Sequence, residues 1–295
     1  MVYRGRFRGR EVAVKKMIFV SGEAMTKERL RNVARELNSY RRLRHPNIVG
    51  YYGTVNDWPN LGLVTELVRG GNNWRCAHTH HLSFLYVYQF WCFEGNLFEL
   101  MYERGVEFSA ADRIKFANQL TIAVCHLHAA DPVVVHRDLK TENCLIDHDG
   151  TLRNCQLKLC DFGLARTIRR GDSFLIEENS GSPRYMPPEA FRKGSRGTTA
   201  IDVWSLACCI IEIFGGPLPF ENLPKMQDVI IEIMSRGGVP KVPFWFPTFF
   251  KNILHRCFSK DPTERPTAAE LQMCLKKLSL RVVKQYGMDH RHEPL

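Results

Sequence analysis

One short polar stretch carries three side chains that suit phosphoryl transfer. Residues 136–143 read His-Arg-Asp-Leu-Lys-Thr-Glu-Asn. Asp138 supplies a carboxylate that could act as a general base. Lys140 supplies an amine that could clamp a phosphate, and Asn143 a carboxamide that could bind a metal ion. Phosphoryl transfer consists mostly of positioning and charge neutralisation, so this set of groups matches what that chemistry requires.

A second acidic motif follows in the chain. Residues 157–163 read Leu-Lys-Leu-Cys-Asp-Phe-Gly, an apolar run that ends at Asp161. A carboxylate placed after a buried strand suits a magnesium ion that bridges phosphates, and the following glycine frees the backbone there. Asp-Phe-Gly alone is common by chance, and it is the spacing after Asp138 that makes the combination specific.

The elements around these motifs can be predicted from apolar patterns. The runs at 133–135 and 145–146 predict two buried strands on either side of the polar loop. Apolar residues at helical spacing predict a helix over 112–130, which ends before Pro132. Residues 202–214 are apolar nearly all round and predict a buried helix.

The N-terminal part reads as a sheet with one helix. Residues 1–20 predict a β-hairpin, and residues 51–55 and 61–68 predict two further strands. Four arginines recur at period two, which places them on one solvated face of an extended chain: Arg4, Arg6, Arg8 and Arg10. An apolar stripe at helical spacing predicts a helix over 26–44, with Glu36 beside the stripe.

Taken together, the motifs resemble those of a eukaryotic protein kinase domain. They are Val-Ala-Val-Lys at 12–15, Leu-Arg-His-Pro-Asn-Ile-Val at 43–49, the two motifs above, Gly-Ser-Pro-Arg-Tyr-Met-Pro-Pro-Glu at 181–189 and Asp-Pro-Thr-Glu-Arg-Pro at 261–266. Lys140 and Ser182 resemble the serine/threonine class. The N-terminal pattern is most similar to the tyrosine-kinase-like group, which contains the mixed-lineage and Raf-type kinases.

The resemblance implies an α+β fold with two lobes. A kinase domain would cover residues 1–280, with a small β-rich N-lobe at 1–68 and a large helical C-lobe at 97–280. An anomalous insertion would occupy 73–96 at the hinge exit, and residues 281–295 would form a polar tail.

The resemblance also assigns roles in an ATP- and Mg²⁺-dependent reaction. Asp138, Lys140 and Asn143 would be catalytic, and Asn143 and Asp161 would hold Mg²⁺. Lys15 would grip the ATP phosphates while paired with Glu36. The residues implied to contact ATP are Val2, Ala13, Lys15, Glu36, Thr65, Glu66, Val68, Leu145 and Asp161.

The same resemblance implies how the activation segment is regulated and which residues stabilise the catalytic loop and the segments around it. Arg137 would bind a phosphorylated activation segment at 164–189, in which Ser173 or Ser180 would be the switch for an upstream kinase or for autophosphorylation. Asp202 would cap its helix or brace the catalytic loop. Arg265 would pair with Glu189, although Pro187 replaces the alanine of the usual Ala-Pro-Glu.

The start of the chain departs from the family. The glycine-rich loop and strand 1 should precede Val2, but the chain begins at Met1. The expectation is a sheet with an unpaired edge and no roof over the phosphates. An incomplete gene model of an active kinase explains this, as does a catalytically impaired, pseudokinase-like scaffold. Against the scaffold, Lys15, Glu36, Asp138 and the magnesium residues are all present.

Residues 73–96 interrupt the family pattern. Gly71-Asn72 recurs as Gly95-Asn96, so that removal of the stretch restores Arg-Gly-Gly-Asn-Leu-Phe-Glu-Leu. The stretch is rich in aromatic residues and histidine, and we expect it to be a structureless loop. A retained intron, a regulatory insertion and a mobile surface loop are the three interpretations.

Composition sets broad limits. The 295 residues are 44% hydrophobic and 24% charged, as in globular proteins, with a net charge of +10 spread along the chain. No basic block predicts nucleic-acid binding, and no apolar run is long enough to predict a transmembrane helix. The ten cysteines form no paired framework, and no signal peptide is evident, so a cytoplasmic location with protein substrates is expected.

Overall fold

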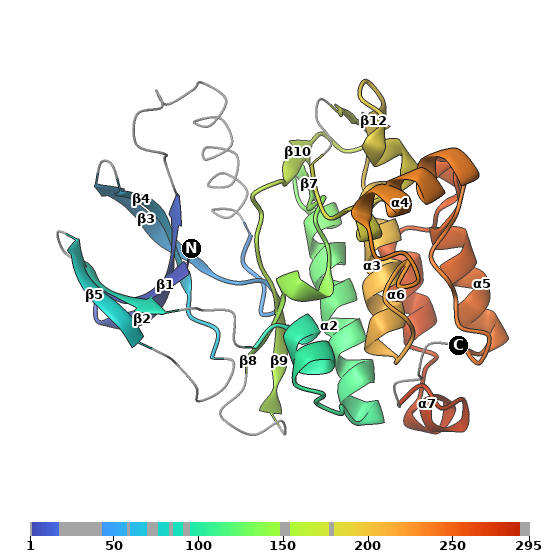
Figure 1. Cartoon of the computed structure of the whole chain (residues 1–295), viewed down its shortest axis with the longest axis horizontal. Coiled ribbons are helices and arrows are strands. Elements are labelled where there is room, and N and C mark those ends of the chain that lie inside the picture. The colour runs from blue at the N-terminus through green and yellow to red at the C-terminus, as the bar shows by residue number, and fades with distance from the viewer. Residues whose placement is uncertain are drawn as a thin grey trace. The chain divides into compact units, whose positions relative to one another are not determined.

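The computed structural model describes residues 2–17, 43–57, 60–69, 76–82, 85–90, 95–147, 154–176 and 180–289 (Figure 1). The chain divides into two compact units. Unit 1 comprises residues 1–104 and 144–163, and unit 2 comprises residues 105–143 and 164–295. Unit 1 contains the main sheet and unit 2 the long helices, which confirms the α+β class. No helix within these ranges is long and apolar enough to cross a membrane.

The main sheet of unit 1 is antiparallel throughout, with the strand order β3-β4-β2-β1-β6-β5. Its strands are β1 (Val2–Phe7), β2 (Arg10–Met17), β3 (Tyr51–Asp57), β4 (Asn60–Glu66), β5 (Cys76–Leu82) and β6 (Leu85–Phe90). A separate hairpin is formed by β8 (Cys144–Asp147) and β9 (Gln156–Leu159). A π-helical turn at Glu99–Glu103 completes the unit.

The predicted N-terminal hairpin is confirmed as β1 and β2. Its two turn residues, Arg8 and Gly9, have positive φ angles of 49° and 78°, as a tight turn matching the strand twist requires. The prediction that the four arginines share one strand face is therefore wrong, because the chain reverses at Arg8 and Arg10 pairs with Phe7, on the opposite face from Arg4 and Arg6. On one face of the sheet, an apolar cluster joins the strands: Val12, Val14 and Val64, with Tyr3, Phe7 and Val55 packed against them.

Residues 76–90 do not form a structureless loop. They form the hairpin β5–β6, and β6 pairs with β1 through Gly5 opposite Val87. The predictions of an unpaired β1 edge and a structureless insertion are both wrong. Alternating tyrosine and valine in β6 favour a strand, and an open edge offers unpaired backbone groups to any strand nearby.

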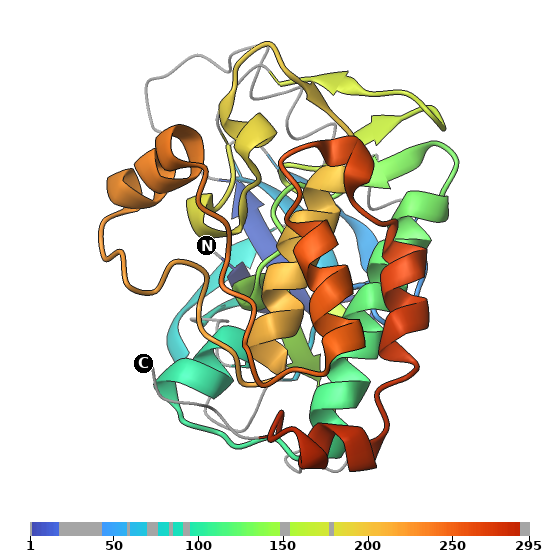
Figure 2. The same ribbon diagram turned by 90° about the vertical axis from the view of Figure 1, so that its right-hand side faces the viewer.

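Unit 2 is built around helices that lie alongside one another: α2 (Ala110–Ala129), α3 (Ala200–Ile213), α5 (Thr248–Cys257) and α6 (Ala268–Leu275) (Figure 2). Shorter elements are α4 (Met226–Ile231), α7 (Leu280–Gln285), and the paired strands β7 (Val133–Val135) with β10 (Arg166–Ile168) and β11 (Phe174–Leu175) with β12 (Arg196–Gly197).

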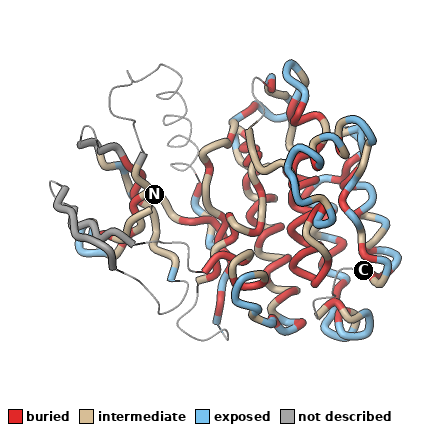
Figure 3. Tube along the Cα trace, in the orientation of Figure 1, coloured by how far each residue is buried: buried red, intermediate tan, exposed pale blue. Residues whose placement is uncertain are grey.

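The two predicted long helices of unit 2 are confirmed. Ser109 caps α2 by accepting a hydrogen bond from the backbone N–H of Asp112. Residues along one face of α2 are buried, including Phe116 and Leu120. Every residue of α3 from Ile201 to Ile213 is buried, as a sequence that is apolar nearly all round predicts (Figure 3).

A buried ion pair ties the segment before α3 to the segment before α6. The guanidinium of Arg265 donates to both carboxylate oxygens of Glu189, over 2.6 and 2.8 Å. It also donates to the carbonyl of Ser259 and lies 5.1 Å from the ring centre of Trp204. The Arg265 side chain is 0% exposed. Because water cannot solvate its charge there, the carboxylate of Glu189 has to balance it. The predicted Glu189–Arg265 pair is confirmed.

Residues 18–42 lie outside the described part of the chain. They hold Glu36 and most of the helix predicted over 26–44. The same applies to residues 290–295 of the predicted tail. The predicted lobe boundaries remain predictions.

Substitution of Arg265 by methionine should destabilise unit 2 by about 3–5 kcal/mol, because it leaves the Glu189 carboxylate buried without its partner. Urea unfolding measures this. The matched control is Arg236→Met, which breaks the exposed pair with Glu232, where Arg236 is 70% exposed. That change should cost less than about 1 kcal/mol. Equal losses from the two substitutions would contradict the prediction.

Deletion of residues 73–96 should expose the edge of β1 and cause self-association, since β6 covers that edge in the intact chain. Light scattering coupled to size-exclusion chromatography measures the mass. A deletion variant that stays monomeric and melts at or above the temperature of the parent would argue instead for the retained-intron interpretation.

Candidate active site

Asp138 is the centre of a compact polar cluster in unit 2. Its Oδ1 accepts a hydrogen bond from the hydroxyl of Ser182 at 2.9 Å. Its Oδ2 accepts from the amide of Asn143 at 3.1 Å and lies 3.6 Å from the Lys140 ammonium. The structure therefore brings the three predicted catalytic residues of the loop together.

The Ser182 hydroxyl shows the position that an alcohol group can take between Asp138 and Lys140. It donates to Asp138 and accepts from the Lys140 ammonium at 2.8 Å. A hydroxyl in this environment faces a carboxylate that can take its proton and a cation that can stabilise negative charge on oxygen. The sequence marked Ser182 only as a feature of the serine/threonine class, and its contact with both catalytic side chains comes from the fold.

Asn143 is oriented by its own loop. Its amide nitrogen donates to the backbone carbonyl of Asp138 at 2.8 Å as well as to the carboxylate. With the nitrogen used in this way, the amide oxygen is the atom available to a cation. Amide and carboxylate oxygens are the donors that Mg²⁺ prefers, so Asn143 fits the magnesium role that the sequence predicted.

Asp202 fixes the backbone of the catalytic loop. Its side chain is 0% exposed and accepts hydrogen bonds from the backbone N–H groups of His136 and Arg137, both at 2.8 Å. The Nε2 atom of His128 on α2 lies 2.9 Å from the same carboxylate. The expectation that Asp202 braces the loop is confirmed.

At Asp202, hydrogen bonds and nearby positive charge lower the pKa by more than burial raises it. Burial raises the pKa of this carboxyl, but the His128 hydrogen bond, the neighbouring histidines and the Arg137 N–H stabilise the ionised form, and the net result is a lowered pKa. Sequence reasoning missed His128, because it belongs to no motif and gains its role only where α2 and α3 meet.

Arg137 connects this loop to the activation segment. Its guanidinium donates to the Ser180 hydroxyl at 3.3 Å and to the Leu164 carbonyl at 3.2 Å. The same group lies 5.1 Å from the ring centre of Phe174. A cation held in this way next to Asp138 suits the predicted role of reading a modified activation segment.

Unit 1 carries the residues predicted to contact ATP. The register pairs Val2 with Lys15 and Ala13 with Thr65, so these four residues share one face of the sheet. The buried cluster around Val12 lies on the opposite face. The sheet therefore brings the four together, while Glu36 lies outside the described residues.

Lys15 has an acidic partner from the Asp-Phe-Gly motif. Its ammonium lies 2.6 Å from Oδ1 of Asp161, and the side chains are 35% and 42% exposed. The same oxygen accepts from the backbone N–H of Gly163 at 3.2 Å. Asp161 adopts a positive φ of 61°, a conformation uncommon outside glycine. Its partly exposed carboxylate has the donor chemistry for Mg²⁺.

The end of β4 is held by a network that the sequence did not predict. Glu66 accepts from the Lys158 ammonium at 2.9 Å and from the backbone N–H of Gly50 at 3.0 Å. Lys158 also donates to the Pro46 carbonyl at 3.1 Å. The sequence predicted Glu66 only as a contact of ATP, and it predicted no role for Lys158, although Lys158 belongs to the Leu-Lys-Leu-Cys-Asp-Phe-Gly motif.

The remaining predicted ATP contacts, Val68 and Leu145, are both half-buried in unit 1. Val68 follows β4, and Leu145 lies in β8 opposite Lys158. Their predicted contacts with adenine remain predictions.

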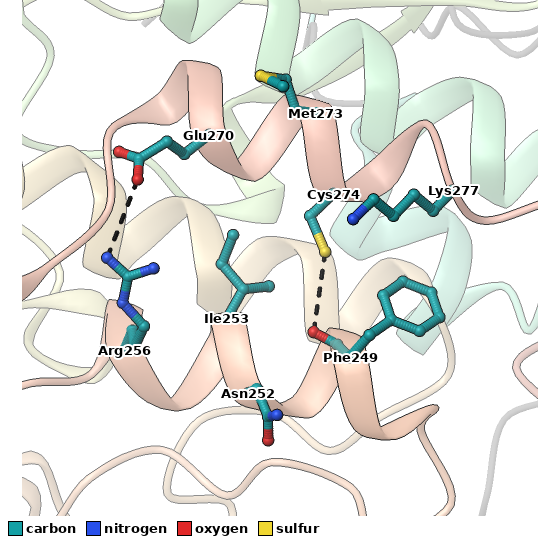
Figure 4. Close-up of a pocket in the computed structure, with 8 residues that line it drawn as sticks. All are labelled: Phe249, Asn252, Ile253, Arg256, Glu270, Met273, Cys274 and Lys277. Atoms are coloured by element: carbon teal, nitrogen blue, oxygen red, sulfur yellow. Dashed lines mark hydrogen bonds and ion pairs between the residues drawn. The ribbon is translucent and has the colours of Figure 1, made fainter.

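A cavity of about 360 Å³ lies between α5 and α6, away from these motifs in the sequence (Figure 4). Its lining is Phe249, Asn252, Ile253, Arg256, Glu270, Met273, Cys274 and Lys277. Burial raises the pKa of the Cys274 thiol, which keeps it protonated and unreactive. None of the predicted site residues lines this cavity.

Comparison with known proteins agrees with the geometry. The sequence model of the family described as protein kinase domain matches residues 1–274. Mitogen-activated protein kinase kinase kinase 1 of Arabidopsis thaliana is 31% identical over 261 residues, which cover 88% of this chain and 37% of the relative. Serine/threonine-protein kinase STY17 of the same plant is 28% identical over 292 residues, covering 99% of this chain and 44% of the relative.

A third relative comes from Dictyostelium discoideum. Probable serine/threonine-protein kinase drkA is 28% identical over 277 residues, which cover 94% of this chain and 37% of the relative. The chain thus spans less than half the length of these relatives.

Substitution of Asp202 by asparagine should destabilise the protein by about 3 kcal/mol at pH 7, because one backbone N–H then meets an amide NH₂ in place of a carboxylate oxygen. The folded-state pKa of Asp202 lies below its ordinary value of 3.8, so its stabilisation is present above pH 3.8 and is lost as pH falls through the folded pKa.

The difference in free energy of unfolding between parent and Asp202→Asn should therefore shrink below pH 3.8, as measured by urea unfolding at several pH values. The exposed Asp228→Asn is the control and should change little at any pH. A difference that stays constant through the acid range would refute the role of the ionised carboxylate.

Proposed function

Since the chain belongs to the protein kinase domain family, we propose that it transfers the γ-phosphoryl group of ATP to serine and threonine hydroxyls of protein substrates. One observation carries the proposal: the Ser182 hydroxyl lies between the Asp138 carboxylate and the Lys140 ammonium. The relatives named as serine/threonine-protein kinases support the same class.

Asp138 acts on the acceptor hydroxyl. A substrate hydroxyl that takes the position illustrated by Ser182 donates its hydrogen bond to Asp138 Oδ1, which orients the oxygen lone pair and receives the proton as the new O–P bond forms. ADP leaves with the electron pair of the broken bond. The Lys140 ammonium stabilises the charge that develops on the transferring phosphoryl group.

Unit 1 supplies the residues for the nucleotide. In unit 1, Lys15 would bind phosphate oxygens and Asp161 would provide a carboxylate for Mg²⁺; in unit 2, Asn143 would provide an amide oxygen for the same type of ion. When bound, Mg²⁺ neutralises the phosphate charge that would otherwise repel the incoming oxygen. Val2, Ala13 and Thr65 share the sheet face of Lys15, which suits contacts with the rest of ATP.

The substrates are proteins, and the role is in signalling. The Arabidopsis relative named mitogen-activated protein kinase kinase kinase 1 supports a place in a phosphorylation cascade with an upstream kinase or autophosphorylation as activator. Ser180, bound by Arg137, is our candidate for the activating site. A cytoplasmic location suits the cysteines whose side chains are described, since none of them forms a disulfide.

Substitution of Asp138 by alanine should lower phosphate transfer by about 10²–10⁴-fold, the range expected when a general base is removed. Radiolabelled ATP with a degenerate serine/threonine peptide mixture measures the rate. The exposed Asp228→Asn is the matched control and should keep the parental rate. Equal transfer by the parent and by Asp138→Ala would exclude the enzyme and leave the scaffold interpretation.

A further inference from the structure

The cavity between α5 and α6 is lined by one stripe of side chains from each helix (Figure 4). The α5 stripe recurs at intervals of three and four residues, as one face of a helix does: Phe249, Asn252, Ile253 and Arg256. The second stripe comes from α6 and from the turn that follows it: Glu270, Met273, Cys274 and Lys277. The cavity therefore follows the surface of two neighbouring helices.

Contacts at its two ends show that α5 and α6 run antiparallel. The guanidinium of Arg256, near the end of α5, lies 3.9 Å from the carboxylate of Glu270, near the start of α6. At the other end the Cys274 thiol donates to the carbonyl oxygen of Phe249 over 3.9 Å. Figure 4 shows both contacts, with Ile253 between them. The stretch from Phe249 to Arg256 is about 10 Å long, or two helical turns.

Apolar side chains in this cavity are open to solvent. Met273 is 67% exposed and Phe249 is 37% exposed, while Ile253 is partly buried. Covering these three side chains would remove apolar surface from water, which is favourable. A methionine is also unbranched and adapts its shape to a partner, which is why binding surfaces often use it.

The backbone of this region favours a helix as the occupant. An extended peptide gains main-chain hydrogen bonds at the edge of a sheet, whereas α5 and α6 bond their own backbone groups internally. A peptide buried here must therefore satisfy its own N–H and C=O groups, as an α-helix does. Two turns of an amphipathic helix, with apolar residues at helical spacing, match the length of the cavity.

The charges at the cavity favour an acidic partner. Arg256 and Lys277 are exposed cations of the lining, and Glu270 is its acidic residue. The Glu270 carboxylate already accepts from the backbone N–H and the hydroxyl of Thr267 at 2.8 and 2.9 Å, which caps α6. A second copy of the chain would bring a net charge of +10 to this surface. Like charges repel, so an acidic partner is favoured over self-association.

We propose that the cavity between α5 and α6 is a docking site for an acidic amphipathic helix of a partner protein. The apolar stripe of that helix covers Phe249, Ile253 and Met273, and its acidic residues lie beside Arg256 and Lys277. None of these side chains belongs to the candidate active site. The docking site is therefore independent of phosphate transfer, and it stands or falls separately from the outcome for Asp138→Ala.

NMR of the methionine methyl groups in the full chain tests the location. The probe is a designed peptide of about 18 residues, long enough to form a helix, with leucines at helical spacing and glutamates beside them. The signal of Met273 is assigned from its absence in Met273→Gln. We expect the peptide to shift this signal and to leave that of Met226, exposed on α4, unchanged. A scrambled peptide of the same composition should shift neither.

Matched variants measure what each side chain contributes, by fluorescence anisotropy of the labelled peptide. Met273→Gln should weaken binding about tenfold or more, as the loss of a central apolar contact does. Lys277→Gln should weaken it about threefold, and this effect should fade as salt is raised. The controls Met226→Gln and Lys193→Gln alter exposed residues elsewhere and should keep the parental affinity. All four positions are exposed, so each variant should melt at the parental temperature.

Four results would overturn the proposal. Parental affinity in Met273→Gln would exclude the cavity as the binding site. Equal weakening by Lys193→Gln and Lys277→Gln would show only diffuse attraction to a basic protein. Equal binding of a peptide with lysines in place of glutamates would remove the acidic partner. A dimer seen by light scattering and abolished by Met273→Gln would assign the surface to a second copy of the chain.

Discussion

The arrangement of the active loop depends on one buried negative charge. Asp202 is fully enclosed, and a carboxylate in that position is tolerated only because three hydrogen bonds converge on it. Two of them come from successive backbone N–H groups, of His136 and Arg137, so the carboxylate stabilises a backbone that would otherwise be strained: Arg137 has a φ of 70°. Because that backbone is fixed, the next residue, Asp138, presents its side chain to Ser182 and Asn143 in a defined direction. The chemistry of the loop is thus set by a residue of α3 that takes no part in it.

The charged side chains of the two units differ in their contacts and in their exposure to solvent. In unit 2 the Asp138 carboxylate, the Lys140 ammonium and the Ser182 hydroxyl hold one another over distances of 2.8 to 3.6 Å. In unit 1 Lys15 and Asp161 pair at 2.6 Å while remaining partly exposed. An exposed pair contributes little to stability and can exchange partners at small cost, which suits the roles proposed for these side chains with phosphates and a metal ion. The Glu189–Arg265 pair is the opposite case, since it is buried, bidentate and structural.

Much of the fold and the identity of the loop residues could be predicted from the sequence. The hairpin at the N-terminus, the buried helix at 202–214 and the cluster around Asp138 all follow from local patterns, either apolar periodicity or short motifs whose members are close in the chain. Most of what could not be predicted involves partners distant in sequence, as when β6 becomes a strand because β1 offers an edge. The one local failure is at Arg8, which leaves the predicted face because the turn requires positive φ. His128 and Lys158 gain roles only through contacts with α3 and β4, which no periodicity encodes.

The described parts of the activation segment are held by a short strand ladder and by surface contacts. Its ladder to β12 is short, and the arginine contacts of Ser173 and Ser180, at 3.2 and 3.3 Å, are partly solvated. Such surface contacts contribute little free energy each, so a single phosphate that strengthens one of them can alter the balance of the whole segment. The Phe174 ring packs on the β7–β10 cluster and also contacts Arg137, so it connects the ladder to the residue that precedes Asp138.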